Sequence, residues 1–479
     1  MAKYDYNMVA IGAGSAGLVT SYICAATKAK VALIEKHKMG GDCLNTGCVP
    51  SKALIRSAKF MKDAKYAESL GFNSVSVDFD FAKIMERVQR VIKTIEPHDS
   101  VDRYTKLGVD CIQGEAKIIS PHEVQVNGKT ITTRNITIAT GARPFVPPIP
   151  GSENTEFYTS DNIWDIRKKP EHLVVLGGGP IGSELAQSFA RLGCKVTQIE
   201  RGDRIMARED LEISNMVMEQ FKKDGVDIKL NHNMVKMSQE GDKKILECES
   251  NGQTVKIECD TILMAIGRSP NTSGFGLEEL GVELNKNGTI KVDPYLRTTK
   301  YKNIYACGDV AGPYQFTHTA AHQAWYCAVN AMVKPFWGFK ADYRVIPWAT
   351  YTDPEVARVG LNEQEAKEKG IPYEVINYGI DDLDRAIADE AAYGVVKVLT
   401  VPGKDTILGV TIAGIHAGDL IAEYVAAMKH GFGMNKILGT IHIYPTLAEA
   451  NKYAAGEWKR SQVTENALAW GERINRWRR

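Results

Sequence analysis

Short apolar runs that end in a glycine turn and continue into a helical stretch are the clearest pattern in the chain. The first run, YNMVAI (residues 6–11), predicts a buried strand, and Gly12, Gly14 and Gly17 follow it. The stretch LVTSYICAAT then predicts a helix, and KVALIE predicts a second strand that ends at Glu35. This order is typical of a dinucleotide-binding unit, in which the glycines let the backbone approach a pyrophosphate and the acid binds a ribose.

The same unit occurs a second time. HLVVL predicts a strand, and Gly177, Gly179 and Gly182 follow it before a second helix and strand. Glu200 ends that strand 18 residues after the last glycine, which is the spacing found in the first unit. Two such units imply two nucleotides, as hydride transfer between a nicotinamide and a flavin requires.

Length, charge and cysteine content narrow the class of protein. A chain of 479 residues suggests roughly three domains. The formal net charge of +1 gives no reason to expect nucleic acid or an anionic membrane as partner, so we expect small-molecule ligands. No apolar run approaches the roughly 18 residues of a membrane span and no cleavable leader is visible, so we expect a cytoplasmic protein without membrane insertion. Nine cysteines spread over the chain do not resemble a secreted disulfide framework.

Two of these cysteines, Cys43 and Cys48, lie close together in GGDCLNTGCVPSK. We expect Pro50 at the first position of a helix, and a helix N-terminus lowers the pKa of a nearby thiol and so favours the reactive thiolate. An accidental pair or half of a zinc site is the alternative. The other seven cysteines are isolated and supply no further ligands at zinc spacing, so we expect no metal site and interpret the pair as a redox-active disulfide beside a flavin.

Further segments carry a family resemblance. Besides the glycine turns and the cysteine segment, the chain contains ATGARP, AIGRSPNT, IYACGDV and HIYPTLAE. Together they resemble the class I pyridine nucleotide-disulfide oxidoreductases, which are FAD-dependent disulfide reductases, and among them the mercuric reductase-like and dihydrolipoamide dehydrogenase-like members. The resemblance implies an α/β fold with two Rossmann-like dinucleotide-binding domains and a C-terminal α+β dimerisation domain. The implied domains are FAD-binding (1–150), NAD(P)-binding (151–272), FAD-binding again (273–343) and interface (344–479).

The resemblance also implies roles for individual residues. Cys48 is similar to the sulfur that faces the flavin and forms the charge-transfer thiolate, and Cys43 to the outer interchange thiol. Lys52 is expected beside the flavin N5, with Glu184 paired to it from the nicotinamide side, and Asp309 at the ribityl chain. From composition alone, this lysine and this glutamate would be surface charges and the aspartate a turn residue. Further implied nucleotide contacts are Gly12, Gly14, Gly17, Glu35, Lys36, Gly41, Gly47, Ala116, Thr140, Gly141, Ser160, Gly177, Gly179, Ile181, Gly182, Glu200, Arg201, Gly267, Arg268, Gly308 and Ala320.

One segment departs from the family pattern. The dithiol reductases close the active site with His-x-His-Pro-Thr-x-x-Glu from the partner subunit, and the second histidine is the acid-base. This chain has His442, Tyr444 and Glu449, so tyrosine occupies the base position. Its unperturbed pKa of about 10 makes it a poor base at neutral pH. We expect Glu449 to bond the phenol, and His442 to point away from the position where it could substitute.

These observations predict a homodimeric FAD enzyme with a shared active site. Electrons would pass from NAD(P)H through the flavin and the Cys43–Cys48 disulfide to a disulfide, a soft metal ion or a small electrophile. Glu200 favours the free 2′-hydroxyl of NAD(H), which we prefer, although Arg201 and the arginines after it would suit NADP(H). Dihydrolipoyl dehydrogenase activity is the first alternative, and a slow redox sensor or interaction protein is the second.

Overall fold

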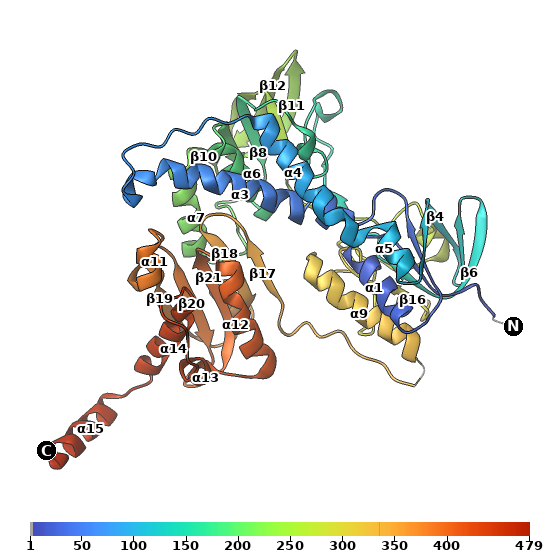
Figure 1. Ribbon diagram of the computed structural model, residues 1–479. Helices are drawn as coiled ribbons and strands as arrows, with labels where there is room; N and C mark the ends of the chain where they lie inside the picture. Colours follow the sequence, from blue (N-terminus) through green and yellow to red (C-terminus); the bar gives the residue numbers. More distant parts are fainter. Residues whose placement is uncertain (1–2, 335) are drawn as a thin grey trace.

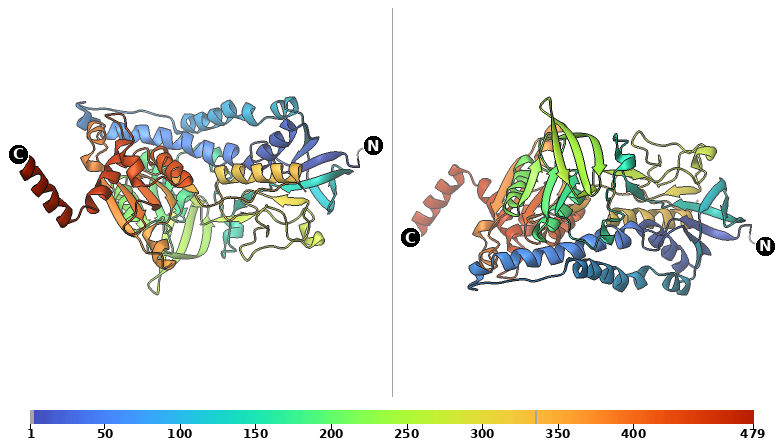
Figure 2. Two further views of the ribbon diagram at one scale, coloured as in Figure 1. Left: turned by 90° about the horizontal axis from the view of Figure 1, so that it is seen from below. Right: turned by 90° about the horizontal axis from the view of Figure 1, so that it is seen from above.

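The protein, described here by a computed structural model for residues 3–334 and 336–479, is built around three large sheets (Figures 1 and 2). In the first sheet the apolar strand β1 is central. Its path is β3 (Val109–Gln113), β2 (Val31–Glu35), β1 (Tyr6–Ile11), β6 (Lys129–Ile138), β5 (Glu123–Val126) and β4 (Ala116–Ser120), and β16 (Ile304–Ala306) also pairs with β6. Helices α1 (Ser15–Ala26) and α9 (Thr317–Val333) pack against each other beside it. A segment after residue 300 therefore returns to the first sheet.

The second sheet repeats the parallel arrangement around the second glycine turn. Its strands are β10 (Val226–Lys229), β9 (Lys195–Ile199), β8 (His172–Leu176) and β14 (Thr261–Met264), with helices α6 (Pro180–Arg191) and α7 (Leu211–Lys223). An antiparallel sheet of β11 (Asn233–Glu240), β12 (Lys243–Ser250) and β13 (Gln253–Cys259) adjoins it. A short pair, β7 (Ala142–Pro144) with β15 (Arg268–Pro270), links the first unit to the second.

The third sheet is antiparallel and belongs to the C-terminal part. Its strands are β17 (Pro347–Thr350), β18 (Glu355–Gly360), β21 (Ile407–Gly414), β20 (Val395–Thr400) and β19 (Glu374–Gly379). Helices α12 (Ala417–His430) and α14 (Glu449–Ser461) share a core with it. Helix α15 (Glu465–Arg478) projects away from this unit (Figure 1). No helix in the described part of the chain is long and apolar enough to cross a membrane.

The cysteine segment lies between the two nucleotide-binding units. Helix α2 (Gly41–Asn45) carries Cys43, and α3 (Cys48–Lys65) runs beside α6 and α4 (Phe81–Ile95), with which it shares a core. The expected helix start at Pro50 is wrong, because α3 begins at Cys48. Proline is tolerated at this third position since the N–H groups of the first turn have no partner within the helix.

Candidate functional site

The two thiols lie at adjoining helix ends and differ in acidity. Cys48 is the first residue of α3, and its Sγ lies 3.4 Å from the hydroxyl of Thr317, the first residue of α9. The hydrogen bond from Cys43, followed by Thr317 and the charge of Lys52, outweighs burial and lowers the pKa of Cys48 to about 6. The pKa of Cys43 is raised, first by its hydrogen bond to Cys48 and then by burial. Cys48 is therefore the thiolate of the pair at neutral pH.

A lysine and a glutamate from two different helices meet next to this thiolate. The Lys52 ammonium on α3 donates to the Glu184 carboxylate on α6, with 2.9 Å between Nζ and Oε2. The other Glu184 oxygen accepts the backbone N–H of Tyr351 at 2.9 Å, and the Lys52 Nζ lies 4.3 Å from the centre of the Tyr351 ring. Because Glu184 is buried, each of its carboxylate oxygens needs a polar partner, and Lys52 and the Tyr351 N–H provide them. The predicted pair is thus formed, and Tyr351 is a third member that no sequence pattern indicated.

The two glycine turns have matching geometry. A side chain at Gly17 or Gly182 would collide with the carbonyl oxygen of the first glycine of its own turn, so close packing explains these two residues. Gly14 and Gly179 are different, because their backbone is extended and a Cβ would meet nothing closer than 3.8 Å at Gly14 and nothing within 4 Å at Gly179. Packing within the protein does not require glycine there, whereas close approach of a pyrophosphate does. These turns therefore fit bound dinucleotides.

The acids at the carboxyl ends of β2 and β9, Glu35 as the last residue of β2 and Glu200 directly after β9, are held alike. Glu35 accepts the N–H of Ala13 at 2.7 Å, and Glu200 accepts the N–H of Gly178 at 2.7 Å. Each carboxylate also accepts the N–H of the residue two positions further along the chain. Both acids therefore brace the glycine turn in addition to lying where a ribose would bind.

One large cavity joins both turns and the cysteines. Its volume is about 1580 Å³, larger than the roughly 300–1,000 Å³ of a typical small-molecule pocket, as two dinucleotides require. The predicted contacts that line it are Gly12, Gly14, Glu35, Lys36, Gly41, Gly47, Ala116, Thr140, Gly141, Ser160, Gly177, Gly179, Ile181, Glu200, Arg201, Gly267, Arg268, Gly308, Asp309 and Ala320. Cys43, Cys48, Lys52 and Glu184 also line it. Gly17 and Gly182 lie beneath the turns.

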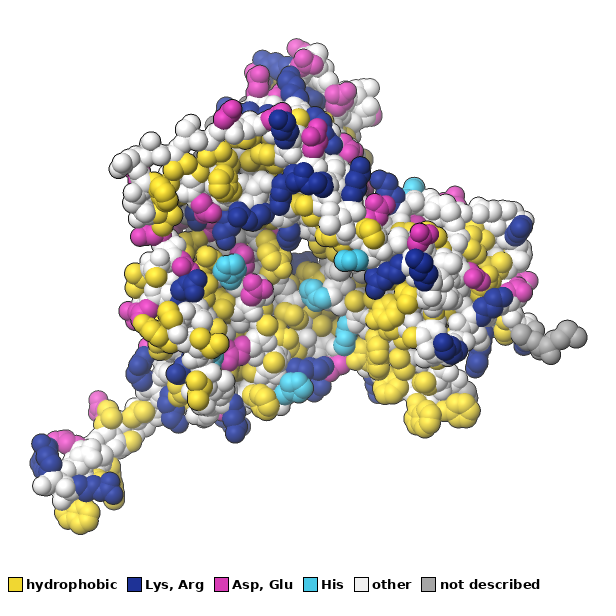
Figure 3. All heavy atoms as spheres, in the orientation of Figure 1, with side chains coloured by type: hydrophobic (Ala, Val, Ile, Leu, Met, Phe, Trp, Pro, Cys, Tyr) yellow, Lys and Arg dark blue, Asp and Glu magenta, His cyan; other side chains and the backbone are white. Residues whose placement is uncertain are grey.

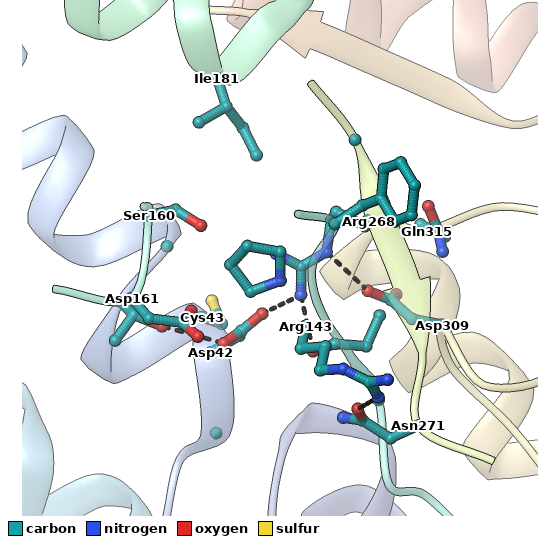
Figure 4. A pocket seen from close by; sticks show the side chains of 18 of the residues that line it. Asp42, Cys43, Arg143, Ser160, Asp161, Ile181, Arg268, Asn271, Asp309 and Gln315 are labelled. Atoms are coloured by element: carbon teal, nitrogen blue, oxygen red, sulfur yellow. Dashed lines mark hydrogen bonds and ion pairs between the residues drawn. The ribbon is translucent and has the colours of Figure 1, made fainter. Parts of the chain in front are cut away.

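A charged cluster lies in the middle of the cavity (Figure 4). The Arg268 guanidinium pairs with Asp42 and lies 3.6 Å from the Asp309 carboxylate. Burial raises the pKa of Asp309, and the charge of Arg268 opposes this effect. Asp42 precedes the first cysteine directly, so its pairing ties the cysteine segment to the strand pair β7–β15. Asp42 was missed at the sequence level because an acid beside a cysteine has no characteristic spacing.

The C-terminal candidates lie away from the cavity of their own chain. The phenol of Tyr444 is exposed and donates to Asp384 at 3.0 Å, which raises the pKa of Tyr444. The prediction that Glu449 binds this phenol is therefore wrong, because the phenol donates to Asp384 instead. Glu449 begins α14 and instead accepts the N–H of Thr446, in the turn before the helix, at 3.2 Å and the phenol of Tyr453, one helical turn along α14, at 3.4 Å.

His442 has a partner of its own. Its side chain is buried, and its Nε2 lies 3.0 Å from a carboxylate oxygen of Glu423. Among the described residues that line the cavity, neither His442 nor Tyr444 occurs. Any role for them at the thiols therefore requires a second copy of the chain.

Comparison with known proteins gives consistent matches. The family described as pyridine nucleotide-disulphide oxidoreductase matches residues 6–324, and its dimerisation domain matches residues 346–455. Mercuric reductase from Bacillus cereus is 34% identical over 452 residues, covering 94% of this chain and 71% of that protein. Dihydrolipoyl dehydrogenase from Geobacillus stearothermophilus is 34% identical over 456 residues, covering 94% and 96%. The structure of a Cu(II) complex of the HOCl-induced flavoprotein disulfide reductase RclA from Escherichia coli superposes with a TM-score of 0.83 at 28% identity, covering 93% of this chain and 98% of that one.

Proposed function

This chain belongs to the pyridine nucleotide-disulphide oxidoreductases, and we propose that it carries electrons from NADH through FAD and the Cys43–Cys48 pair to a thiophilic metal ion. The predicted family, fold class and enzyme class are confirmed by these matches. The family and its flavoprotein relatives support FAD as one bound nucleotide. The matched dimerisation domain supports a homodimer.

The chain's own part in this path is to hold a thiolate ready next to the nucleotides. Bound FAD would accept a hydride from the nicotinamide and pass the electron pair to the disulfide. Cys43, Thr317 and Lys52 each stabilise Cys48 as the thiolate, and Glu184 holds the lysine in place. When the Cys43 thiol and the Cys48 thiolate return to the disulfide, two electrons and one proton leave them. The electrons reduce one Hg(II) to Hg(0), or two Cu(II) to two Cu(I), and water takes the proton.

The observation that carries the metal proposal is the phenol at position 444. Exchange between a dithiol and an organic disulfide needs a group that accepts and returns a thiol proton near neutral pH. Tyr444 already has a high pKa, and its hydrogen bond to Asp384 raises it further. A soft metal ion instead binds thiolates directly and needs no such base. Mercuric reductases among the relatives and the Cu(II) complex of the Escherichia coli protein support this class of acceptor.

Shared use of the site by two subunits is part of the proposal. Tyr444 is exposed in the single chain and lies outside the cavity among the described residues, so it is available to the thiols of a partner. In that position its single O–H would turn from Asp384 and donate a hydrogen bond to a metal-bound anion or thiolate, without competing as a base.

The proposed preference for NADH rests on the second nucleotide site. Glu200 directly follows β9 and lines the cavity, where its negative charge would repel a 2′-phosphate. Arg204 is engaged with Gln364 at 2.8 Å, which leaves Arg201 and Arg208 as the basic residues at this end of the cavity. Comparing kcat/KM for NADH and NADPH tests this preference, and a higher value for NADPH would contradict it.

Anaerobic titration with NADH tests the electron path. At the two-electron level we expect a long-wavelength thiolate-to-flavin absorbance band in the wild type and none in Cys48→Ser. Steady-state rates with Cu(II), Hg(II), glutathione disulfide and dihydrolipoamide then identify the acceptor. Reduction of a metal ion by the wild type and its loss in Cys43→Ser support the proposal. Fast dihydrolipoamide turnover without metal reduction would favour the dihydrolipoyl dehydrogenase alternative, and the absorbance band without turnover on any acceptor would favour a redox sensor.

A further inference from the structure

Helix α15 (Glu465–Arg478) is an exposed addition to the family's dimerisation domain. It begins after Thr464, whose hydroxyl caps it by accepting the N–H of Ala467 at 3.3 Å. The match to the dimerisation domain ends at residue 455, so α15 lies beyond the matched residues. None of its side chains is buried, and it projects from the body of the protein (Figures 1 and 2).

One face of α15 is apolar and exposed to solvent. Trp470, Ile474 and Trp477 are separated by four and three residues, so they share one face of the helix. The two tryptophans are 67% and 85% exposed, which is unusual for such large apolar side chains. An amphipathic helix in this state requires either a protein surface or a lipid interface to cover it.

The charges on α15 favour one of these two partners, a lipid interface, over a protein surface. At about 3.6 residues per turn, Arg473 and Arg478 fall on the two edges of the apolar face, and Glu465 and Glu472 fall on the opposite side. Arg476 is neutralised by Glu472 at 2.7 Å. Within the described residues, no carboxylate lies within ion-pair distance of the two edge arginines (Figure 3 shows the apolar, basic and acidic side chains of the projecting helix).

We propose that α15 docks in the plane of an anionic lipid surface, with its tryptophan face in the interface. Tryptophan prefers the level of the lipid headgroups, and edge arginines extend toward phosphates while their stems cover apolar surface. Pairing with α15 of a second copy would bring the edge arginines of both helices together, which like charges disfavour. The overall charge of +1 conceals this local positive patch, which explains why total charge alone does not predict an anionic membrane as partner.

Vesicle sedimentation of the full-length holoenzyme tests this proposal. We expect binding to phosphatidylcholine vesicles that contain phosphatidylglycerol, and weak binding to phosphatidylcholine alone. Arg473→Gln combined with Arg478→Gln should lower the affinity about 25-fold, since each arginine near an anionic surface contributes about fivefold. Trp470→Ser combined with Trp477→Ser should abolish binding, because the apolar face is then lost.

Two matched controls make the test specific. Arg476→Gln removes an arginine from the far side, and Leu468→Ser removes an apolar residue outside the tryptophan face, so neither should reduce binding more than about twofold. Equal losses in these controls, or no binding of the wild type to anionic vesicles, would overturn the proposal. Sedimentation velocity of the double tryptophan variant tests the alternative that α15 packs against a second copy of the chain. An intact dimer agrees with lipid docking, whereas dissociation would show that α15 covers a second copy.

Discussion

Replacing Tyr444 by histidine should convert this enzyme toward dithiol–disulfide chemistry. In the wild type, the phenol donates to Asp384, which raises its pKa above the usual value. A tyrosine with a pKa of about 10 is ionised in roughly one molecule in a thousand at pH 7, whereas about three quarters of histidines with a pKa near 6.5 are neutral bases. The fraction present as a competent base therefore rises by about 700-fold. General base catalysis contributes about 10²–10⁴ in rate, so we predict at least a tenfold gain in dihydrolipoamide turnover.

The assay is NAD⁺ reduction by dihydrolipoamide at pH 7, run beside metal reduction by NADH. Tyr444→Phe is the matched control, because it removes the phenol without supplying a base and should show no gain with dihydrolipoamide. Both variants should keep the thiolate-to-flavin band, since Cys43, Thr317 and Lys52 stabilise the Cys48 thiolate without Tyr444. If the wild type already turns over dihydrolipoamide rapidly, or if Tyr444→His gains no more than Tyr444→Phe, the base argument is refuted.

Three further changes test the cavity and its support. Thr317→Val removes the hydroxyl 3.4 Å from Cys48, and the pKa of that thiol, read from the pH dependence of the charge-transfer band, should rise by about one unit; an unchanged midpoint would contradict the contact. Gly179→Ala should leave the melting temperature unchanged, because a Cβ meets nothing there, yet raise KM for NADH at least about tenfold; an unchanged KM would remove the pyrophosphate argument. Asp353→Asn removes the carboxylate that Arg191 and Lys62 share, leaves Arg191 with Asp224 alone and should cost up to about 3 kcal/mol, measured as a melting temperature several degrees lower at pH 7. Because neighbouring positive charges outweigh burial and lower the pKa of this aspartate to about 2, its stabilisation is complete above pH 4 and disappears as pH falls through about 2; a difference that persists at low pH would contradict that assignment.

Local patterns predict most of the nucleotide-binding architecture. A strand, a glycine turn and a helix are adjacent in sequence, so the spacing of the glycines is enough to place Gly14 and Gly179 at the turns. Thr317 and Tyr351 could not be placed in this way, because they reach the redox pair from distant segments; Thr317 and Cys48 are 269 residues apart. The partner of Glu449 was mispredicted for a local reason, since the Thr446 N–H in the turn before its own helix and the Tyr453 phenol one turn along it bind the carboxylate.

The segment that enters the third sheet links the C-terminal unit to the redox pair of its own chain. Trp348 donates to Glu209 at 3.0 Å, the backbone N–H of Tyr351 donates to Glu184 at 2.9 Å, and Asp353 pairs with Arg191 at 2.8 Å. Each bond crosses from the C-terminal unit to α6 or to the segment just before α7. The position of the glutamate that holds Lys52 therefore depends on the same unit that carries Tyr444. In the proposed dimer, a rearrangement of that unit would reach the thiolate by two routes, through Tyr444 of the partner subunit and through Tyr351 within the chain.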